Sequence, residues 1–139
     1  MTIDMAAFNR SLIEEFRATG GRPGGPVAGI DLILLTTTGA RTGRPHTTPL
    51  GYTLDGSPDR IILFASNRGA PRHPAWFHNL VAHSEVQVER RDETFTARAR
   101  VAEGAEREHL LALWLAASPA TATHEAMAGR TIPMVLLQR

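Results

Sequence analysis

The residues with the richest chemistry lie close together, between positions 36 and 50. Hydroxyl groups, glycines, arginines and a histidine follow an apolar run that ends at Leu35. Arginine binds phosphate and carboxylate groups with a planar fork of N–H donors, and successive backbone N–H groups in a glycine-containing turn can form an anion-binding concavity. The stretch therefore predicts a loop between two strands that binds a small acidic ligand. Its candidate residues are Thr36, Thr37, Thr38, Gly39, Arg41, Thr42, Gly43, Arg44 and His46.

A simpler interpretation of the same loop stays open. Gly39 and Gly43 could serve a hairpin turn, with Arg41 and Arg44 exposed to solvent. The loop is not a nucleotide P-loop, because the spacing G-x-x-x-x-G-K-[ST] does not occur in it. A dinucleotide-binding fingerprint would require G-x-G-x-x-G at the start of a helix, and this is not found either.

A second strand-to-loop transition carries two more arginines. Residues 61–66 form an apolar run typical of a buried strand. Residues 67–74 are rich in turn-forming residues and include Arg68 and Arg72, and residues 75–82 follow as a short helix. Two loops that follow strands thus carry four arginines between them, which favours the binding interpretation.

Three ordered motifs give the chain a family resemblance. Residues 36–52 read T-T-T-G-x-R-T-G-x-P-x-T-x-P-L-x-Y, and residues 65–80 read A-S-x-x-G-A-x-x-x-P-x-W-x-x-N-L. Both resemble signatures of deazaflavin-dependent nitroreductases and quinone reductases, and the R-x-I-P segment within residues 129–137 resembles the C-terminal strand of that family. The resemblance covers roughly residues 5 to 138. It implies an α+β fold, an antiparallel split β-barrel of the FMN-binding type with peripheral helices.

The resemblance also implies a coenzyme and a reaction. The coenzyme would be F420, an 8-hydroxy-5-deazaflavin with a phosphate and an oligoglutamate tail, which supplies a hydride from ring position 5. The acceptor would be a small organic molecule such as a quinone or a nitro compound. Motif matching assigns the phosphate-bearing side chain of the coenzyme to Arg41, Thr42, Gly43, Arg44 and His46. It assigns the edge of the ring to Ala65, Ser66 and Asn67.

Some positions depart from the usual residues of the family. Relatives often carry Arg-Lys at positions 40 and 41 and arginine in place of His46, so this chain loses one charge and its binding of the coenzyme tail becomes pH-dependent. Nitro-activating relatives carry tyrosines in the region of residues 118–124, where this chain has none and where His124 occupies such a position. We therefore expect quinones rather than nitro compounds as acceptors, with Tyr52 and His124 as substrate-binding candidates.

Several alternatives stay open at this point. The residues predict no clear catalytic acid, and the proton for the acceptor could come from solvent, Tyr52 or Ser66. Tyr52 could equally be packed within a strand, and Trp76 could be either a core residue or a neighbour of the coenzyme ring, whereas Trp114 is expected in the core. The alternative functions are an FMN-dependent reductase of the same barrel type and a non-enzymatic protein that binds the coenzyme, haem or a fatty acid.

Composition narrows the class of protein. The chain of 139 residues is 42% hydrophobic and 21% charged, as expected for one globular domain over residues 1–139. Its net charge of +1 argues against general nucleic-acid binding, which needs a clustered basic face. All 15 basic residues are arginine, so lysine Schiff-base chemistry is excluded. We expect a cytoplasmic protein, because the sequence has neither a secretory signal nor an apolar run of about 18 residues. We also expect it to be a monomer or a homodimer.

The residue types also argue against a metal site. Cysteine is absent from the sequence, which excludes disulfides and thiolate ligands. His73, His78 and His83 recur every five residues, a spacing that does not bring them onto one helix face. No metal is therefore expected.

The expected elements place the motifs on strands and loops. An amphipathic helix covers residues 1–20 and a glycine-rich linker covers 21–29. This helix is expected to pack on the barrel rather than rest on a membrane surface, because its acidic residues offset its arginines. Five to six short strands are expected, at 30–35, 47–54, 61–66, 86–89, 95–101 and 133–138. Further helices are expected at 75–82, 103–117 and 123–128.

Overall fold

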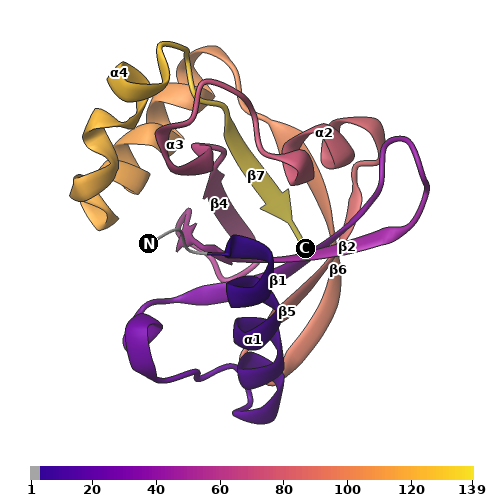
Figure 1. Ribbon diagram of the computed structural model, residues 1–139. Coiled ribbons are helices and arrows are strands. Elements are labelled where there is room, and N and C mark those ends of the chain that lie inside the picture. Colours follow the sequence, from indigo (N-terminus) through magenta and orange to yellow (C-terminus); the bar gives the residue numbers. More distant parts are fainter. Residues whose placement is uncertain (1–3) are drawn as a thin grey trace.

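The fold is built on one antiparallel sheet, which the computed structural model shows together with its helices for residues 4–139. Seven strands follow the order β2-β1-β5-β6-β7-β4-β3 across it. The strands are β1 (Leu32–Thr38), β2 (Pro45–Gly51), β3 (Thr53–Leu54), β4 (Arg60–Phe64), β5 (Glu85–Arg90), β6 (Glu93–Val101) and β7 (Met134–Gln138). The helices are α1 (Met5–Ala18), α2 (Ala75–Ala82), α3 (Gly104–Ala117) and α4 (His124–Ala128), with 3-10 turns η1 (Gly25–Val27), η2 (Asn67–Gly69) and η3 (Pro119–Thr123). Figure 1 shows the sheet curled, with α2, α3 and α4 in the upper half of the view.

The curl of the sheet follows from the connection between β2 and β3. These strands lie at opposite edges of the strand order, yet only Tyr52 separates them along the chain. One residue spans less than about 4 Å, so the two edges must approach each other and the sheet closes into a split barrel. The predicted α+β split-barrel fold is confirmed. The predicted strand over residues 47–54 is divided at Tyr52, because its first part pairs with β1 and its second with β4, which gives seven strands rather than five to six.

Strands β4 and β7 are buried on both faces. Side chains alternate along a strand, so Ile61 and Leu63 pack in the barrel interior while Ile62 and Phe64 pack in an outer cluster with residues of α3 and α4. This double burial explains why residues 61–66 and 134–137 read as uninterrupted apolar runs. Trp114 of α3 is buried in the outer cluster and donates its indole N–H to Thr121, which confirms it as a core residue.

The two segments predicted to bind a ligand leave the sheet at the same end. Four antiparallel pairings separate β1 from β4 in the strand order, so these two strands run in the same direction. The loop after β1 (residues 39–44, the arginine loop) and the segment after β4 (residues 65–74, the β4–α2 segment) therefore emerge at one end of the barrel. Helix α2 then connects the β4–α2 segment to β5.

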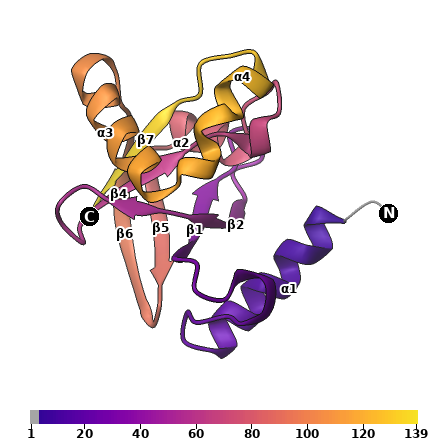
Figure 2. The same ribbon diagram turned by 90° about the vertical axis from the view of Figure 1, so that its left-hand side faces the viewer.

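Helix α1 packs beside β2 through the second half of its apolar stripe. Leu12 and Phe16 are buried, whereas Met5 and Phe8 are only partly so. Arg17, in the last turn, donates two hydrogen bonds of 2.9 Å to the carboxylate of Glu89 on β5. Figure 2 shows the N-terminal end of α1 directed away from the sheet. The predicted packing is confirmed for the second half of the helix, and residues 1–3 of the predicted helix lie outside the described residues.

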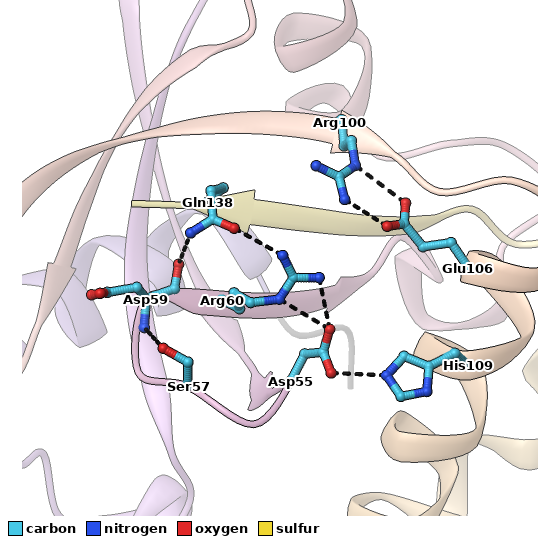
Figure 3. A network of polar contacts seen from close by, with 8 residues as sticks. All are labelled: Asp55, Ser57, Asp59, Arg60, Arg100, Glu106, His109 and Gln138. Carbon is cyan, nitrogen blue, oxygen red and sulfur yellow. Dashed lines mark hydrogen bonds and ion pairs between the residues drawn. The ribbon is translucent and has the colours of Figure 1, made fainter.

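Polar contacts fasten α3 to the hairpin formed by β3 and β4 (Figure 3). Asp55 follows β3 and accepts hydrogen bonds of 3.1 and 2.9 Å from the guanidinium of Arg60. Its second carboxylate oxygen lies 2.8 Å from Nε2 of His109 on α3. Arg60 also donates to the side-chain oxygen of Gln138 on β7 at 2.9 Å. The hairpin, the C-terminal strand and α3 are thus connected through Asp55 and Arg60.

Candidate functional site

The arginine loop is a tight turn held by its own backbone. The N–H of Gly39 donates to the carbonyl of Arg44 at 2.8 Å, and the N–H of Gly43 donates to the carbonyl of Gly39 at 2.9 Å. Gly43 has a φ of +70°, which residues with a side chain rarely adopt, and a Cβ on Gly39 would lie 2.6 Å from Oγ1 of Thr42. The turn itself therefore requires both glycines.

Asn79 of α2 anchors this loop to the barrel. Its side chain is 8% exposed, accepts the backbone N–H of Ala40 at 2.9 Å and donates to Oγ1 of Thr37 at 3.1 Å. Reasoning from sequence does not select Asn79 as a site residue, although it is part of the W-x-x-N-L motif. The available signal is a polar residue on the buried face of an apolar helix, which must find hydrogen-bond partners.

The loop offers fewer free backbone donors than the sequence suggests. Within the loop, the N–H groups of Arg41 and Thr42 have no hydrogen-bond partner among residues 4–139. The loop N–H groups that already have partners are those of Gly39, Ala40, Gly43 and Arg44. The successive N–H groups available for an anion are therefore reduced to those of Arg41 and Thr42, because the other loop N–H groups already have partners within the protein. Side-chain guanidinium and hydroxyl groups are left as the main donors for a ligand.

A cavity of about 770 Å³ opens between the arginine loop and α2. Its lining residues are Gly39, Ala40, Arg41, Thr42, His46, Thr47, Thr48, Ala75, Trp76, His78 and Asn79. Arg41 and Arg44 are exposed, and their guanidinium groups contact no acceptor among the residues that the structure describes. Free guanidinium groups beside a cavity can bind the phosphate or carboxylate of a ligand.

The cavity brings together part of the predicted site. The predicted residues that line it are Gly39, Arg41, Thr42, His46 and Trp76. Thr38, Gly43 and Arg44 belong to the end of β1 or to the arginine loop without lining the cavity. Trp76 is 7% exposed and packs in the barrel interior, which confirms it as a core residue, and it also forms part of the cavity wall. The lining residues that sequence reasoning missed are Ala40, Thr47, Thr48, Ala75, His78 and Asn79.

Ser66 and His124 lie together at the same end of the barrel, outside the lining of this cavity. Oγ of Ser66 lies 2.5 Å from Nδ1 of His124 and accepts the backbone N–H of Gly69 at 3.1 Å. The imidazole of His124 stacks on Phe64 with ring centroids 6.3 Å apart. Ala65 is buried beside Ser66, and Asn67 is exposed and donates its side-chain amide to the carbonyl of Arg72. The structure thus pairs one predicted coenzyme contact with one predicted substrate contact.

Tyr52 lies at the other end of the hairpin formed by β1 and β2. It lines a second cavity of about 410 Å³, together with Asp31, Arg22 and Arg91. Along the chain, four positions separate Tyr52 from Thr48, which lines the first cavity, and this corresponds to roughly 13 Å along a strand. Burial of the phenol, and then the charge of Asp31, raise the pKa of Tyr52 above its ordinary value. The structure therefore does not bring Tyr52 together with the arginine loop.

The histidines of the second motif are closer than their spacing suggests. The rings of His73 and His78 meet edge to face with centroids 5.6 Å apart, because His73 precedes α2 and is not bound by the helical geometry. Residues 4–139 contain no group of three His, Asp or Glu side chains arranged to hold a metal ion.

Comparison with known proteins identifies the family of this chain. The chain matches the family model of the F420H(2)-dependent quinone reductases over residues 8–139. It belongs to this family. A relative, the F420H(2)-dependent quinone reductase of Mycobacterium tuberculosis, is 34% identical over 129 residues, which cover 89% of this chain and 85% of the relative. The solved structure of an F420-H2 dependent reductase (FDR-A) has a TM-score of 0.70 at 33% identity, covering 78% of this chain and 94% of that one. A further structure, described as a domain-swapped dimer, has a TM-score of 0.73 at 30% identity, covering 97% of this chain and 100% of that one.

The family is F420H2-dependent, which confirms the expectation of an oxidoreductase with a deazaflavin coenzyme. The residues of the cavity fit such a coenzyme. The free guanidinium groups of Arg41 and Arg44 would suit its phosphate and carboxylates, and the side chain of Trp76 in the cavity wall would suit a flat ring. Residues 4–139 form no helix with the length and apolar character needed to cross a membrane.

Proposed function

We propose that the protein binds reduced F420 in the cavity between the arginine loop and α2 and reduces a quinone-type acceptor there. The observation that supports this most directly is the pair of free guanidinium groups, Arg41 and Arg44, beside a cavity walled by Trp76. Such a pairing of cationic and aromatic groups suits a ligand with an acidic side chain and a flat ring. Membership of the F420H(2)-dependent quinone reductases supports the choice of coenzyme and acceptor.

The protein's part in this reaction is to bind and orient. When bound, the reduced coenzyme supplies the hydride, and the protein sets the geometry in which it is supplied. Arg41, Arg44 and Thr42 hold the acidic side chain of the coenzyme, with His46 adding a charge when it is protonated. Asn79 keeps the arginine loop in place by accepting a hydrogen bond from the backbone N–H of Ala40. Ala65, Ser66 and Asn67 lie outside the lining of this cavity but at the same end of the barrel, and we assign them to the edge of the ring.

Reduction of a quinone by a hydride also consumes one proton. Tyr52 lies at the far end of the β1–β2 hairpin, and its raised pKa makes it a weaker acid. Ser66 lies at the same end of the barrel as the arginine loop and is hydrogen-bonded to His124, which is only partly buried. We therefore favour Ser66 and His124 over Tyr52 as the residues nearest the acceptor, with solvent as the other proton source.

A fluorescence titration with the oxidised deazaflavin coenzyme tests this proposal, with FMN titrated in parallel. Saturation by the deazaflavin at micromolar concentration or below, together with oxidation of the reduced coenzyme by a quinone, is the expected result. Binding of FMN alone would make the protein a flavin enzyme of the same fold. Binding of the deazaflavin without turnover of quinones or nitro compounds would leave it a coenzyme carrier.

We also propose that the chain is a monomer or a homodimer in solution. A structural relative at 30% identity is described as a domain-swapped dimer. Light scattering after size exclusion would distinguish the two states, and a larger assembly would contradict both.

A further inference from the structure

Arg130 is the centre of a hydrogen-bond network that no part of the proposed reaction uses. It lies between α4 and β7, and its guanidinium makes five contacts with the β4–α2 segment. One terminal nitrogen is within 3.0 to 3.3 Å of the carbonyls of Ala65, Ser66 and Arg72. The Nε–H donates to the carbonyl of Ala70 at 3.2 Å. One side chain thus holds both ends of a segment far from it in sequence.

The segment that Arg130 holds needs such support. Asn67, Arg68 and Gly69 have φ values of +51°, +59° and +78°, and the first two are residues with side chains in the left-handed region. Residues in this region carry a conformational cost that the surrounding structure must offset. The carbonyls on both sides of this turn accept hydrogen bonds from Arg130, so its guanidinium is well placed to fix the turn.

The remaining contact of Arg130 defines the protonation state of His73. The second terminal nitrogen of the guanidinium lies 2.9 Å from Nδ1 of His73. A guanidinium has only donors, so Nδ1 must be an acceptor and the ring must be neutral with its proton on Nε2. A second proton would remove the acceptor and place two cations in contact. The titratable and charged groups that face His73 are Arg130 and His78, and both disfavour its protonated form.

His73 connects this network to the cavity. It precedes Pro74 and the first turn of α2, whose Ala75, Trp76 and His78 line the cavity. Its ring lies against Phe77 with centroids 4.7 Å apart and meets His78 edge to face. A shift of His73 would therefore move the residues that form one wall of the cavity.

We propose that Arg130 and His73 form a positioning pair: neutral His73 completes the contacts of Arg130, fixes the β4–α2 segment and the start of α2, and releases them when it is protonated. Burial, and then the charges of Arg130 and His78, lower the pKa of His73 below its ordinary value. A lowered pKa in the folded protein means that the contribution of the pair is present above the ordinary histidine value and is lost as the pH falls through the lowered one. The site is thus held in shape at neutral pH and loosens in acid.

Nitrogen-15 NMR of the free, full-length protein tests the pair without any ligand. We expect His73 to carry its proton on Nε2 at pH 7.5 and to have a pKa below that of an ordinary histidine. The backbone amide signals of residues 65–73 should shift with pH as His73 is protonated. These shifts should disappear in His73→Asn, whose side-chain oxygen can accept the same hydrogen bond without titrating. In Arg130→Met the pKa of His73 should rise, because a neighbouring cation is removed. A proton on Nδ1, or amides that respond equally in His73→Asn, would overturn the proposal.

Coenzyme affinity extends the test to the site, and this part alone rests on the proposed function. As the pH falls from 7.5 through the lowered pKa of His73, the dissociation constant of the wild type should rise more than that of His73→Asn, by up to about tenfold, the loss expected for one charge-assisted hydrogen bond. Every other group of the protein is common to the two proteins, so the ratio isolates His73. Arg130→Lys should weaken binding at pH 7.5, whereas the exposed control Arg98→Lys should not. Equal pH dependence in wild type and His73→Asn would refute the link to the cavity. If neither protein binds the coenzyme, the proposed function fails while the NMR result still decides the pair.

Discussion

Asn79 accepts the backbone N–H of Ala40 at 2.9 Å although the two residues lie 39 positions apart in the chain. The contact joins the first sequence motif to the second, and it fixes the arginine loop relative to the helix that forms the opposite wall of the cavity. A buried amide with both of its polar atoms paired is a rigid support, because breaking either hydrogen bond leaves a polar group without a partner. The geometry of the site therefore depends on a residue whose side chain points into the protein.

Replacement of Asn79 by alanine should affect stability and binding together. The change removes two buried hydrogen bonds and leaves the N–H of Ala40 and the hydroxyl of Thr37 without their partner. We expect the free energy of unfolding to fall by about 2–3 kcal/mol and the affinity for the coenzyme to fall with it. Urea unfolding and the fluorescence titration measure the two effects. Gln87→Ala, which removes an exposed amide bonded to Thr96, is the control and should change neither.

Replacement of Arg41 and Arg44 by alanine should affect binding alone. Neither guanidinium makes a hydrogen bond or an ion pair with another described residue, so the free energy of unfolding should stay within about 0.5 kcal/mol of wild type. Each charged hydrogen bond to the coenzyme contributes about 1.5–3 kcal/mol, so the double variant should bind at least about 100-fold more weakly. The matched control is Arg10→Ala with Arg22→Ala, two exposed arginines away from this cavity. Unchanged affinity in the Arg41 and Arg44 variant would remove the arginine loop from the site.

Much of the fold could be predicted because its signals are local. The apolar periodicity locates α2 and α3 to within a residue, and the alternation of residues 86–89 and 95–101 predicts the β5–β6 hairpin. The division of residues 47–54 at Tyr52 could not be predicted in this way. It depends on which strands pair, and β2 and β3 pair with partners at opposite edges of the sheet. Pairing between distant segments leaves no mark in the local pattern.

In the candidate site, too, some features could be predicted from the sequence and others depend on the fold. The residue types of the arginine loop indicate an acidic ligand, because guanidinium chemistry does not depend on the fold. The backbone donors of the loop could not be assigned from sequence, since the turn geometry decides whether an N–H is free, and here Gly39 and Gly43 use theirs internally. In the sequence, Arg130 likewise belongs to the R-x-I-P segment and indicates only the start of the C-terminal strand. Its role becomes visible only when β7 pairs with β4 and brings residue 130 to the segment that follows β4.

Replacement of Tyr52 by phenylalanine should leave the reaction unchanged. The phenol lines the second cavity, on the far side of β1 from the arginine loop. We expect kcat/KM with a quinone acceptor to stay within about twofold of wild type, because the phenol does not line the cavity in which we propose that the coenzyme binds. Ser66→Ala provides the comparison and should lower kcat/KM. A loss of more than tenfold in Tyr52→Phe would instead place the acceptor beside Tyr52.

The carboxylate of Asp55 should make the stability of the fold sensitive to acid. Its side chain is 13% exposed, and the hydrogen bond with His109, followed by the two from Arg60, lowers the pKa of this carboxyl below its ordinary value of 3.8 (Figure 3). A lowered pKa in the folded protein means that the stabilisation is present above the ordinary value and is lost as the pH falls through the lowered one.

Asp55→Asn should therefore reduce the free energy of unfolding by about 1–2 kcal/mol at pH 7 and by progressively less below pH 4. Urea unfolding of the two proteins between pH 2.5 and pH 7 measures this convergence. Asp92→Asn, in the exposed turn between β5 and β6, is the control and should follow the wild type at every pH. A constant difference between wild type and Asp55→Asn across this range would show that the carboxylate is not held by its partners, and that α3 is fastened to the barrel by its apolar face alone.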